Sequence, residues 1–343
     1  MTQYQVQPLD RVRLDAAAAY LARRSGTDSR ALVEELEWRL FRNPATTPGL
    51  ELGQLLVGGS GEIAGVNVAV PQQFQHDGRS LVGLCSSAFY VDDGARLQGF
   101  LMFRRFLATP GADFVFATTC NAVSAGLWER MGALPVPDSR QELIVPLHPR
   151  PIIESRLRGH PARGMAAVAG RLAGGLLAAA RAASAGSVRL TPAADLAEAA
   201  ARVTAVTNAG VLTASRTEAF LRWRYAGGPG THRLWLAEDA KGRKGWIAVS
   251  RIERALIPGV RSWMVSDLVW PREGRRSVLM AAAGLVQDEG DVLAVRGADA
   301  LEAGAPLGWR RSFPQVPVWA YSRQERLSAA GIHMVPADGD TVP

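Results

Sequence analysis

Short apolar runs alternate with segments of helical periodicity along the whole chain. Runs of aliphatic and aromatic residues bounded by turn residues predict strands, whereas apolar residues recurring at helical spacing predict amphipathic helices. In the first half this pattern predicts a Gly-rich turn at 58–61, helices at 29–41, from 97 onward and at 124–130, and strands at 52–58, 63–71, 81–91, 114–118 and 142–147.

The second half repeats this alternation of strands and helices. It predicts helices at 193–206, 216–225, 275–287 and 298–305, and strands at 233–238, 244–252, 262–270, 291–295 and 316–322. Strands and helices that alternate in this way are typical of α/β or α+β packing. We therefore predict an α/β (α+β) fold in which each half is a mixed sheet flanked by helices.

An internal repeat relates the two halves. Trp38 and Pro44 recur as Trp223 and Pro229, in each case 185 positions later. Further matches occur at the smaller offsets of 180, 179 and 176 positions: Gly65 with Gly245, Arg96 with Arg275, and Gly132 with Gly308. Short insertions and deletions in loops produce such a drift after a duplication, so the sequence predicts two copies of one fold in tandem.

Two domains and a linker account for the length of the chain. Its 343 residues fit two domains of about 150 residues each. We place them at 1–150 and 189–325, with a linker at 151–188 and a tail at 326–343. The Ala/Gly-rich part at 161–186 has the pattern of an amphipathic helix, which we expect to pack on the domains. Peripheral membrane contact through this helix is the less favoured alternative, because it lacks Trp and Phe.

The composition is that of a globular protein, with 48% hydrophobic and 21% charged residues. A net charge of +7 favours anionic ligands, but no nucleic-acid-binding motif accompanies it, so nucleic acid is not an expected partner. The five His residues lack metal-ligand spacing, and no metal is expected. Cys85 and Cys120 are expected to be buried thiols. With neither a signal pattern nor an apolar run of membrane-spanning length, the expected location is cytoplasmic.

The most informative segment lies where the strand at 81–91 meets the next helix. It reads Arg96-Leu97-Gln98-Gly99-Phe100-Leu101. A Gly in a strand-to-helix turn lets backbone N–H groups approach an anion, and the helix N-terminus adds partial positive charge. A pyrophosphate is the expected occupant of such a turn, and an ordinary helix start is the alternative interpretation.

This segment resembles the pyrophosphate loop of the GNAT (Gcn5-related) N-acyltransferases, which reads Gln/Arg-x-x-Gly-x-Gly/Ala. Arg96 and Gly99 match the loop, and Leu101 stands where the second small residue is expected. The order that follows is also similar to the family's, with a strand, then Asn121, then a helix that ends at Gly132. The tandem plan looks like that of two-domain GNAT proteins; the resemblance covers 30–147 and, more faintly, 190–322.

The resemblance implies acetyl-CoA or another acyl-CoA as co-substrate. The pantetheine arm would lie between two splayed strands, a backbone N–H would polarise the thioester, and an amine would attack it. The expected acceptor is a small-molecule amine or a sugar amine. Carried over to this chain, the expected CoA-binding residues are Val91, Arg96, Leu97, Gln98, Gly99, Phe100, Leu101 and Asn121.

Proton transfer is less clearly assigned. In many GNAT enzymes a Tyr on the helix after the Asn protonates the leaving thiolate, but the corresponding residue here is Trp128, whose indole is no acid near neutral pH. Tyr90 is a candidate to replace it, and the alternative is that Tyr90 packs on a helix. Asp92 is a candidate to contact the substrate amine, and the alternative is a simple turn residue.

Asp267 is the third catalytic candidate. It lies in the apolar run at 263–270, where a buried carboxylate needs a partner. We expect a structural pair with Arg222 or Arg224, and the alternative is a base of perturbed pKa facing a cleft. The turn of this second copy, at 275–280, lacks Gly, so we do not expect this copy to bind CoA in the usual way.

Three functional interpretations follow from these residues. The first is an acyl-CoA-dependent N-acyltransferase, most simply an acetyltransferase. The second is a catalytically silent GNAT-like module that binds CoA or a partner, which Trp128 and Leu101 favour. The third is a transferase similar to the peptidoglycan aminoacyltransferases of the Fem type, which share the duplicated plan but take aminoacyl-tRNA as donor.

Overall fold

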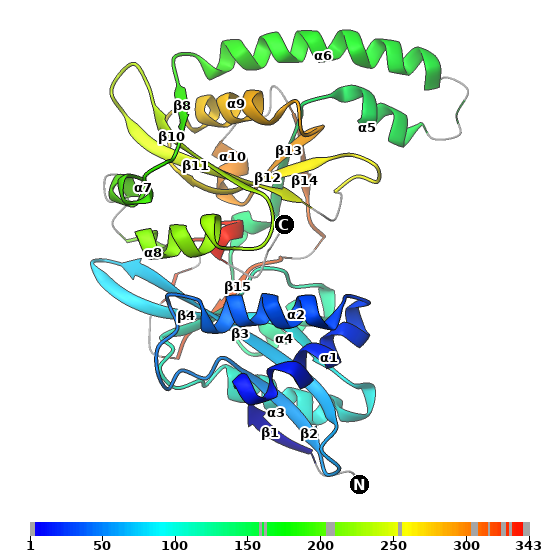
Figure 1. Cartoon of the computed structure of the whole chain (residues 1–343), viewed down its shortest axis with the longest axis vertical. Helices are drawn as coiled ribbons and strands as arrows, with labels where there is room; N and C mark the ends of the chain where they lie inside the picture. The colour runs from blue at the N-terminus through cyan, green and yellow to red at the C-terminus, as the bar shows by residue number, and fades with distance from the viewer. Residues whose placement is uncertain are drawn as a thin grey trace.

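Two β-sheets, one in each half of the view in Figure 1, form the framework of the computed structural model. The structure describes residues 4–157, 160, 163–203, 210–252, 256–302, 308–314, 316–323, 327–328 and 331–338. Both sheets contain parallel and antiparallel pairs, and helices flank both. The predicted α/β (α+β) class is therefore confirmed.

The first sheet has the strand order β1-β2-β3-β4-β5-β15-β6 among the described residues. These strands are β1 (Tyr4–Pro8), β2 (Gly53–Gly58), β3 (Ile63–His76), β4 (Arg79–Val91), β5 (Phe114–Ala117), β15 (Trp319–Tyr321) and β6 (Leu134–Pro135). Two short strands extend it from the end of β3, namely β9 (Leu212–Ala214) and β16 (Ile332–His333).

The second sheet has the order β14-β7-β13-β12-β11-β10-β8 among the described residues. Its strands are β14 (Trp309–Ser312), β7 (Gln141–Pro146), β13 (Val292–Arg296), β12 (Ser262–Val269), β11 (Lys244–Ile252), β10 (His232–Glu238) and β8 (Arg189–Pro192). Most positions of β11, β12 and β13 are buried, as expected for strands covered by helices on both faces.

Each sheet contains at least one strand from the other half of the chain, and the first sheet also includes β9 and β16 from the second half. β7 lies in the second sheet between β13 and β14, and β15 lies in the first sheet between β5 and β6. The prediction that a strand at 142–147 closes the first domain is therefore wrong, as is the placement of the strand at 316–322 in the second. Sheet membership crosses the predicted boundaries at 150 and 189, because an apolar run shows that a strand is buried but not which sheet buries it.

The same irregularity occurs at the same place in both sheets. β4 pairs with β5 only from Gly83 to Cys85, and β12 pairs with β13 only from Ser262 to Met264. Beyond this point a bulge at Ala88, with φ of 49°, interrupts β4, and a bulge between Ala248 and Val249 interrupts the pairing of β11 with β12. Matching irregularities confirm the duplication that the sequence repeat predicts.

Helices cover both faces of the first sheet. α1 (Leu14–Ser25) and α2 (Ser29–Leu36) pack on one face, in the cluster that contains Phe74 and Phe116. α3 (Arg96–Phe106) and α4 (Ala122–Arg130) pack on the other face through Phe103, Phe106 and Trp128. The two helix pairs thereby sandwich β3, β4 and β5.

The second sheet is covered in the same way. α9 (Arg275–Val286) packs on one face, and α7 (Leu196–Val203) and α8 (Glu218–Leu221) pack on the other. The short helix α10 (Ala298–Glu302) follows β13 directly. The helix predicted at 193–206 is described as far as Val203, and residues 204–206 lie outside the described residues. The helix predicted at 298–305 is described as far as Glu302, and residues 303–305 lie outside the described residues.

Two helices occupy the linker at the top of Figure 1. α5 (Pro149–Arg156) and α6 (Arg163–Ala185) contact each other, and α6 also contacts α9. The helix predicted at 161–186 is therefore present as α6, with 161–162 outside the described residues. Its outer side exposes Val168, Leu172 and Leu176. Among the described helices, none combines the length and the apolar character that crossing a bilayer requires. Peripheral membrane contact through α6 stays a prediction.

The duplicated Trp residues form the contact between the two halves. Trp38, in the π-helix η2 (Glu37–Phe41), stacks on Trp223, in the π-helix η5 (Arg222–Ala226), with 4.6 Å between ring centroids and 18° between ring planes. Each indole N–H donates to the backbone carbonyl of the other Trp, at 3.2 and 3.0 Å. This reciprocal contact joins equivalent residues of the two copies, as expected where two copies are related by a local two-fold axis.

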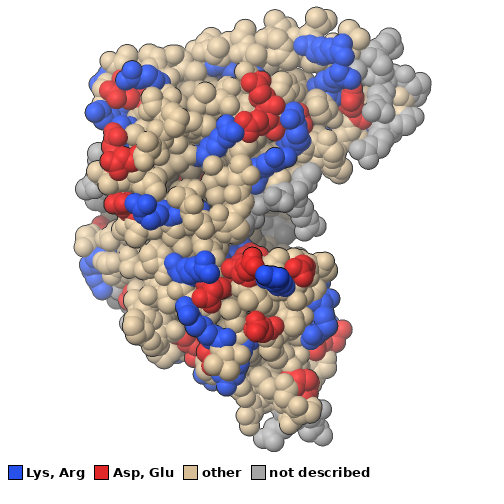
Figure 2. All heavy atoms as spheres, viewed as in Figure 1, with Lys and Arg blue, Asp and Glu red and all other residues tan. Residues whose placement is uncertain are grey.

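Charged residues are interspersed over the face shown in Figure 2, and the net charge of +7 does not gather there in one basic patch. Many charges form exposed pairs one helical turn apart, such as Arg222 with Glu218, and such pairs contribute at most about 0.5 kcal/mol each. The sequence also has basic pairs at 275–276 and 310–311, a pattern that is typical of a solvated face. Arg275 and Arg311 instead form ion pairs with the buried carboxylates of Asp299 and Glu142.

Candidate functional site

Strand β4 has an edge that runs past the end of β5. The last pair between them joins Cys85 to Phe116, and β5 ends at Ala117. From Ser86 to Val91, β4 pairs with β3 on one side, and no strand in the described part of the chain pairs with its other side. An extended ligand can add to such an edge as an additional strand, because the backbone N–H and C=O groups there point outward.

Helix α3 begins just beyond this edge, after the 3₁₀ turn η3 (Asp93–Ala95), and its N-terminus has no side-chain cap. Ala95 occupies the N-cap position and has no oxygen that could accept from the first-turn amides. Arg96 extends from the first turn and forms an exposed pair with Asp93, Nη2 to Oδ1 at 2.9 Å. Uncapped amides beside a guanidinium favour an anion at this position. On the outer side of the helix, Leu97 is 70% exposed and Leu101 is 51% exposed.

Gly99 faces inward, toward the end of β4. A Cβ atom at this position would lie 2.8 Å from Val91 Cγ2 and 2.9 Å from Val91 Cγ1. Only glycine therefore lets the first turn of α3 lie so close to Val91. The Arg96-x-x-Gly99 pattern thus has a packing cause that needs no ligand, and its effect is to hold the uncapped amides beside the β4 edge. Gln98 is half-buried and Phe100 is exposed.

Tyr90 and Asp92 end the strand in different surroundings. Tyr90 is 44% exposed, and its hydroxyl has no hydrogen-bond partner among the described residues. Asp92 accepts a hydrogen bond of 2.9 Å from the Tyr20 hydroxyl and forms an ion pair with Arg24, both in α1. Burial and the hydrogen bond to Asp92 raise the pKa of Tyr20 to about 12. Asp92 therefore anchors α1, whereas Tyr90 is accessible.

Asn121 and Trp128 lie on the other side of the β4 edge, in and before α4. Asn121 is the N-cap of α4, where its Oδ1 accepts from the N–H groups of Val123 and Ser124, both at 3.0 Å. Trp128 is 2% exposed and packs edge-on against Phe103, with 5.1 Å between ring centroids. Trp128 is therefore part of the core and is unable to contact a substrate.

Asp267 belongs to a buried ion cluster in the second sheet. Arg216 forms ion pairs with both Asp267 and Asp338, and none of the three side chains is more than 5% exposed. Asp338 lies in the C-terminal 3₁₀ turn η7 (Pro336–Asp338). The Tyr225 hydroxyl lies 3.5 Å from Asp267 Oδ2 and donates to it. Asp267 thus has the buried cationic partner that the structural interpretation requires.

The partner of Asp267 differs from the prediction. Arg216, rather than Arg222 or Arg224, is the arginine that the structure pairs with it, and Arg222 is exposed and bound to Glu218 instead. Helical spacing in the sequence places arginines on a helix but does not show which of them a distant strand contacts. Because two carboxylates share one guanidinium in this cluster, burial dominates and raises the pKa of Asp267 to about 6, although Arg216 opposes the shift.

We expect stability to depend on this carboxyl group between about pH 4 and pH 6. A folded-state pKa of about 6, above the ordinary 3.8, means that the folded chain binds the proton more tightly, so this contribution falls as the pH rises through that window. Asp267→Asn removes it. Relative to the natural chain, the free energy of unfolding of the variant should rise by on the order of 2 kcal/mol between pH 4 and pH 7. The measurement is the melting temperature of both proteins as a function of pH. Parallel profiles for the two proteins would contradict the assignment.

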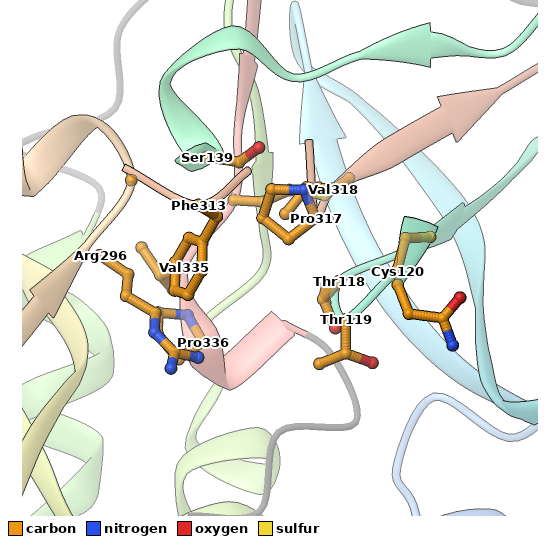
Figure 3. Close-up of a pocket in the computed structure, with 13 residues that line it drawn as sticks. Thr118, Thr119, Cys120, Ser139, Arg296, Phe313, Pro317, Val318, Val335 and Pro336 are labelled. Atoms are coloured by element: carbon orange, nitrogen blue, oxygen red, sulfur yellow. The ribbon is translucent and has the colours of Figure 1, made fainter. Parts of the chain in front are cut away.

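A cavity of about 270 Å³ lies between the end of β5 in the first sheet and the end of β13 in the second sheet (Figure 3). Its wall on the β5 side is formed by residues 118–121, and Arg296 and Gly297 at the end of β13 form the other side. The remaining described lining residues are Ser139, Phe313, Pro317, Val318, Met334, Val335 and Pro336. Thr118 Oγ1 lies 4.0 Å from Cys85 Sγ, so the cavity begins where β4 and β5 separate.

The structure brings most of the predicted site residues to one place. Tyr90, Val91, Asp92 and residues 96–101 all lie at the end of β4 and the start of α3, and Asn121 lies in the cavity wall on the far side of the strand gap. Asp267 is apart from them in the second sheet. Arg296 was not singled out from the sequence. Its role depends on the pairing of β13 with β7, which places it beside Glu142, and the sequence does not show that pairing.

Solved structures of acyltransferases have the same architecture, although no family model and no curated protein sequence matches the chain. A probable N-acyltransferase from Enterococcus faecalis superposes with a TM-score of 0.55 at 10% identity, over 94% of this chain and 73% of that one. A GCN5-related N-acetyltransferase from Anabaena variabilis gives 0.55 at 14% identity, over 93% and 72%. N-myristoyltransferase from Saccharomyces cerevisiae, solved with myristoyl-CoA, gives 0.52 at 11% identity, over 98% and 90%. The fold of this chain is therefore that of the GCN5-related N-acetyltransferases, present twice in tandem.

Proposed function

We propose that the chain is an acyl-CoA-dependent N-acyltransferase whose donor site is the β4 edge together with the N-terminus of α3. The observation that carries this proposal is the edge of β4 from Ser86 to Val91, with which no described strand pairs on the β5 side and which leads to an uncapped helix start. The pantetheine arm has amide groups that can pair with the strand edge, and its pyrophosphate suits the amides of α3 and Arg96. The Anabaena variabilis and Saccharomyces cerevisiae proteins support the same class of donor by their names.

Transfer of the acyl group requires few catalytic side chains. An amine nitrogen attacks the thioester carbonyl carbon, so that a C–N bond forms and the C–S bond breaks. The bulge opposite Asn67 leaves Ala88 and Phe89 out of the β3 ladder, where a backbone N–H can polarise the carbonyl oxygen. The amine loses one proton and CoA leaves as a thiol with one proton. Tyr90 is the accessible hydroxyl at this edge that could supply the proton to the thiolate.

The donor site is tested by placing a negative charge at the helix start. In Leu97→Glu, the side chain is exposed and a carboxylate in the first turn favours the helix, so folding should be unaffected. Calorimetric titration with acetyl-CoA and with octanoyl-CoA should show at least tenfold weaker binding than in the natural chain, because the carboxylate repels the phosphates.

Two variants serve as controls for this titration. Leu97→Gln has nearly the same shape without the charge and should bind within about twofold of the natural chain. Leu172→Glu adds the same charge at an exposed position of α6 and should have no effect. Unchanged affinity in Leu97→Glu would move the donor away from α3. Absence of any acyl-CoA binding to the natural chain would favour the Fem-like transferase or a silent module that binds a partner instead of CoA.

A second candidate function is a module that binds acyl-CoA without turnover. The burial of Trp128 favours it, because the helix position at which the family supplies its acid is here part of the core. Release of CoA from acetyl-CoA in the presence of amines separates the two. Acyl-CoA binding without release above the rate in buffer, over a broad amine panel, would support the silent module.

A further inference from the structure

The cavity between β5 and β13 is built by equivalent parts of the two copies. β5 is parallel to its neighbour β4, β13 is parallel to its neighbour β12, and both β5 and β13 point their carboxyl ends at the cavity. Ligand sites in α/β sheets commonly lie outside the carboxyl ends of such strands. Its volume of about 270 Å³ is just below the range of roughly 300–1,000 Å³ that is usual for drug-sized ligands, so it suits a smaller molecule.

A row of three charged side chains crosses the second sheet at one end of this cavity. Glu142 in β7 lies directly opposite Arg296 in β13 on one side and Arg311 in β14 on the other. The Glu142 side chain is fully buried and accepts from Arg296 Nε at 2.7 Å and from Arg311 Nε. One carboxylate between two guanidiniums leaves the row with one excess positive charge.

Arg296 is the member of this row that borders the cavity. It uses Nε for Glu142, and its two Nη nitrogens have no hydrogen-bond acceptor among the described residues. Its guanidinium lies over the Phe313 ring, 5.3 Å from the centroid, and the following Gly297, with φ of 74°, turns the chain away at the end of β13. The orientation of Arg296 is therefore fixed before any ligand binds.

The other described residues of the cavity wall are mostly apolar and carry no second charge. Among the described lining residues there is no carboxylate, and Phe313, Val318, Met334 and Val335 contribute apolar surface. Thr118, Thr119, Asn121 and Ser139 contribute neutral polar groups. A molecule that matches these walls has an apolar body and one anionic group directed at Arg296. The planar guanidinium, with two free donor nitrogens, suits a carboxylate.

We propose that this cavity is the acceptor site and that the acceptor is an amine that also carries a carboxylate, of the class of apolar α-amino acids. Arg296 holds the carboxylate, the apolar walls take the side chain, and the amine is directed toward the gap between β4 and β5, where Thr118 and Cys85 meet. The inference rests on the proposed function for the role of the amine. The carboxylate site itself stands on the geometry of the cavity.

A matched pair of variants tests the assignment. Arg296→Gln and Arg311→Gln each remove one positive charge and one hydrogen bond to Glu142, and each leaves Glu142 one arginine, but Arg296 alone borders the cavity. The probes are L-leucine, L-methionine and L-phenylalanine, each compared with its amide, which lacks the charge. Binding is measured by calorimetry on the full chain, and CoA release from acetyl-CoA is measured alongside.

The natural chain should prefer the free acids over the amides by at least tenfold, in affinity or in kcat/KM. Arg296→Gln should lose that preference and keep its affinity for acetyl-CoA, and Arg311→Gln should stay within about twofold of the natural chain. Equal use of acids and amides, or an equal loss in both variants, would overturn the inference. Acid binding that Arg296→Gln abolishes, in a chain that binds no acetyl-CoA, would support the cavity site and overturn the proposed function.

Discussion

Replacing Arg216 with glutamine is expected to lower the free energy of unfolding by about 3–5 kcal/mol. Arg216 is the cation between Asp267 and Asp338, and all three side chains are buried. Its removal leaves two carboxylates together in the interior without a positive partner, which is far less favourable than the loss of an exposed pair. Urea denaturation at pH 7 measures the change.

The pH dependence of the Arg216→Gln variant separates this cause from simple loss of packing. Without the guanidinium, burial raises the pKa of the Asp267 carboxyl group further above its unfolded value, so the folded state takes up a proton as the pH falls. The variant should therefore recover much of its lost stability relative to the natural chain between pH 7 and pH 5. Arg222→Gln, which removes an exposed pair, should change stability by at most about 0.5 kcal/mol. A deficit that is the same at both pH values would contradict the charge argument.

The second large effect is expected at the contact between the two copies. Trp38→Ala should cost about 3–5 kcal/mol, because it removes a buried indole, its stacking on Trp223 and one of the two reciprocal hydrogen bonds. The same substitution at Trp223 removes the other side of the contact. Thermal unfolding of both single variants and the double variant is the measurement.

The double-mutant cycle shows whether the two indoles act together. We expect a coupling free energy of about 1 kcal/mol or more between Trp38 and Trp223. Ring stacking and hydrogen bonds each stabilise the pair beyond what the burial of the two side chains contributes. A cycle of Trp38→Ala with Leu176→Ala, an exposed position on α6, is the control and should be additive. Additivity between the two Trp residues would mean that their contact does not contribute to holding the two copies together.

The local elements of the fold could be predicted from the sequence, whereas the partners of those elements could not. Each copy of the Trp motif, at 38 and at 223, and the strand-to-helix turn at 96–101 are short segments of consecutive residues, so the sequence pattern shows them directly. The placement of β7 and β15 depends on which sheet edge each strand meets, and their short apolar runs carry no information about that choice.

The candidate site divides in the same way. Arg96, Gly99 and Tyr90 lie within a few residues of one another in the chain, so their grouping at the end of β4 could be predicted. The pairing of Arg216 with Asp267 and of Arg296 with Glu142 joins residues that are far apart in sequence. Such pairs depend on strand register across the sheet, and a register is fixed only once the neighbouring strands are known.

The exchange of β7 and β15 sets the order in which the chain can fold during its synthesis. β15 fills the place between β5 and β6, so this place in the first sheet stays empty until residue 321 has left the ribosome. At about 5–20 residues per second, the wait after β7 emerges is on the order of ten seconds or more. Throughout that time the nascent first half exposes the edge of β5 and the unpaired apolar strand β7, which is the kind of surface that chaperones bind and that aggregation begins from. The half of the protein that is made first is therefore completed only after most of the second half has been made.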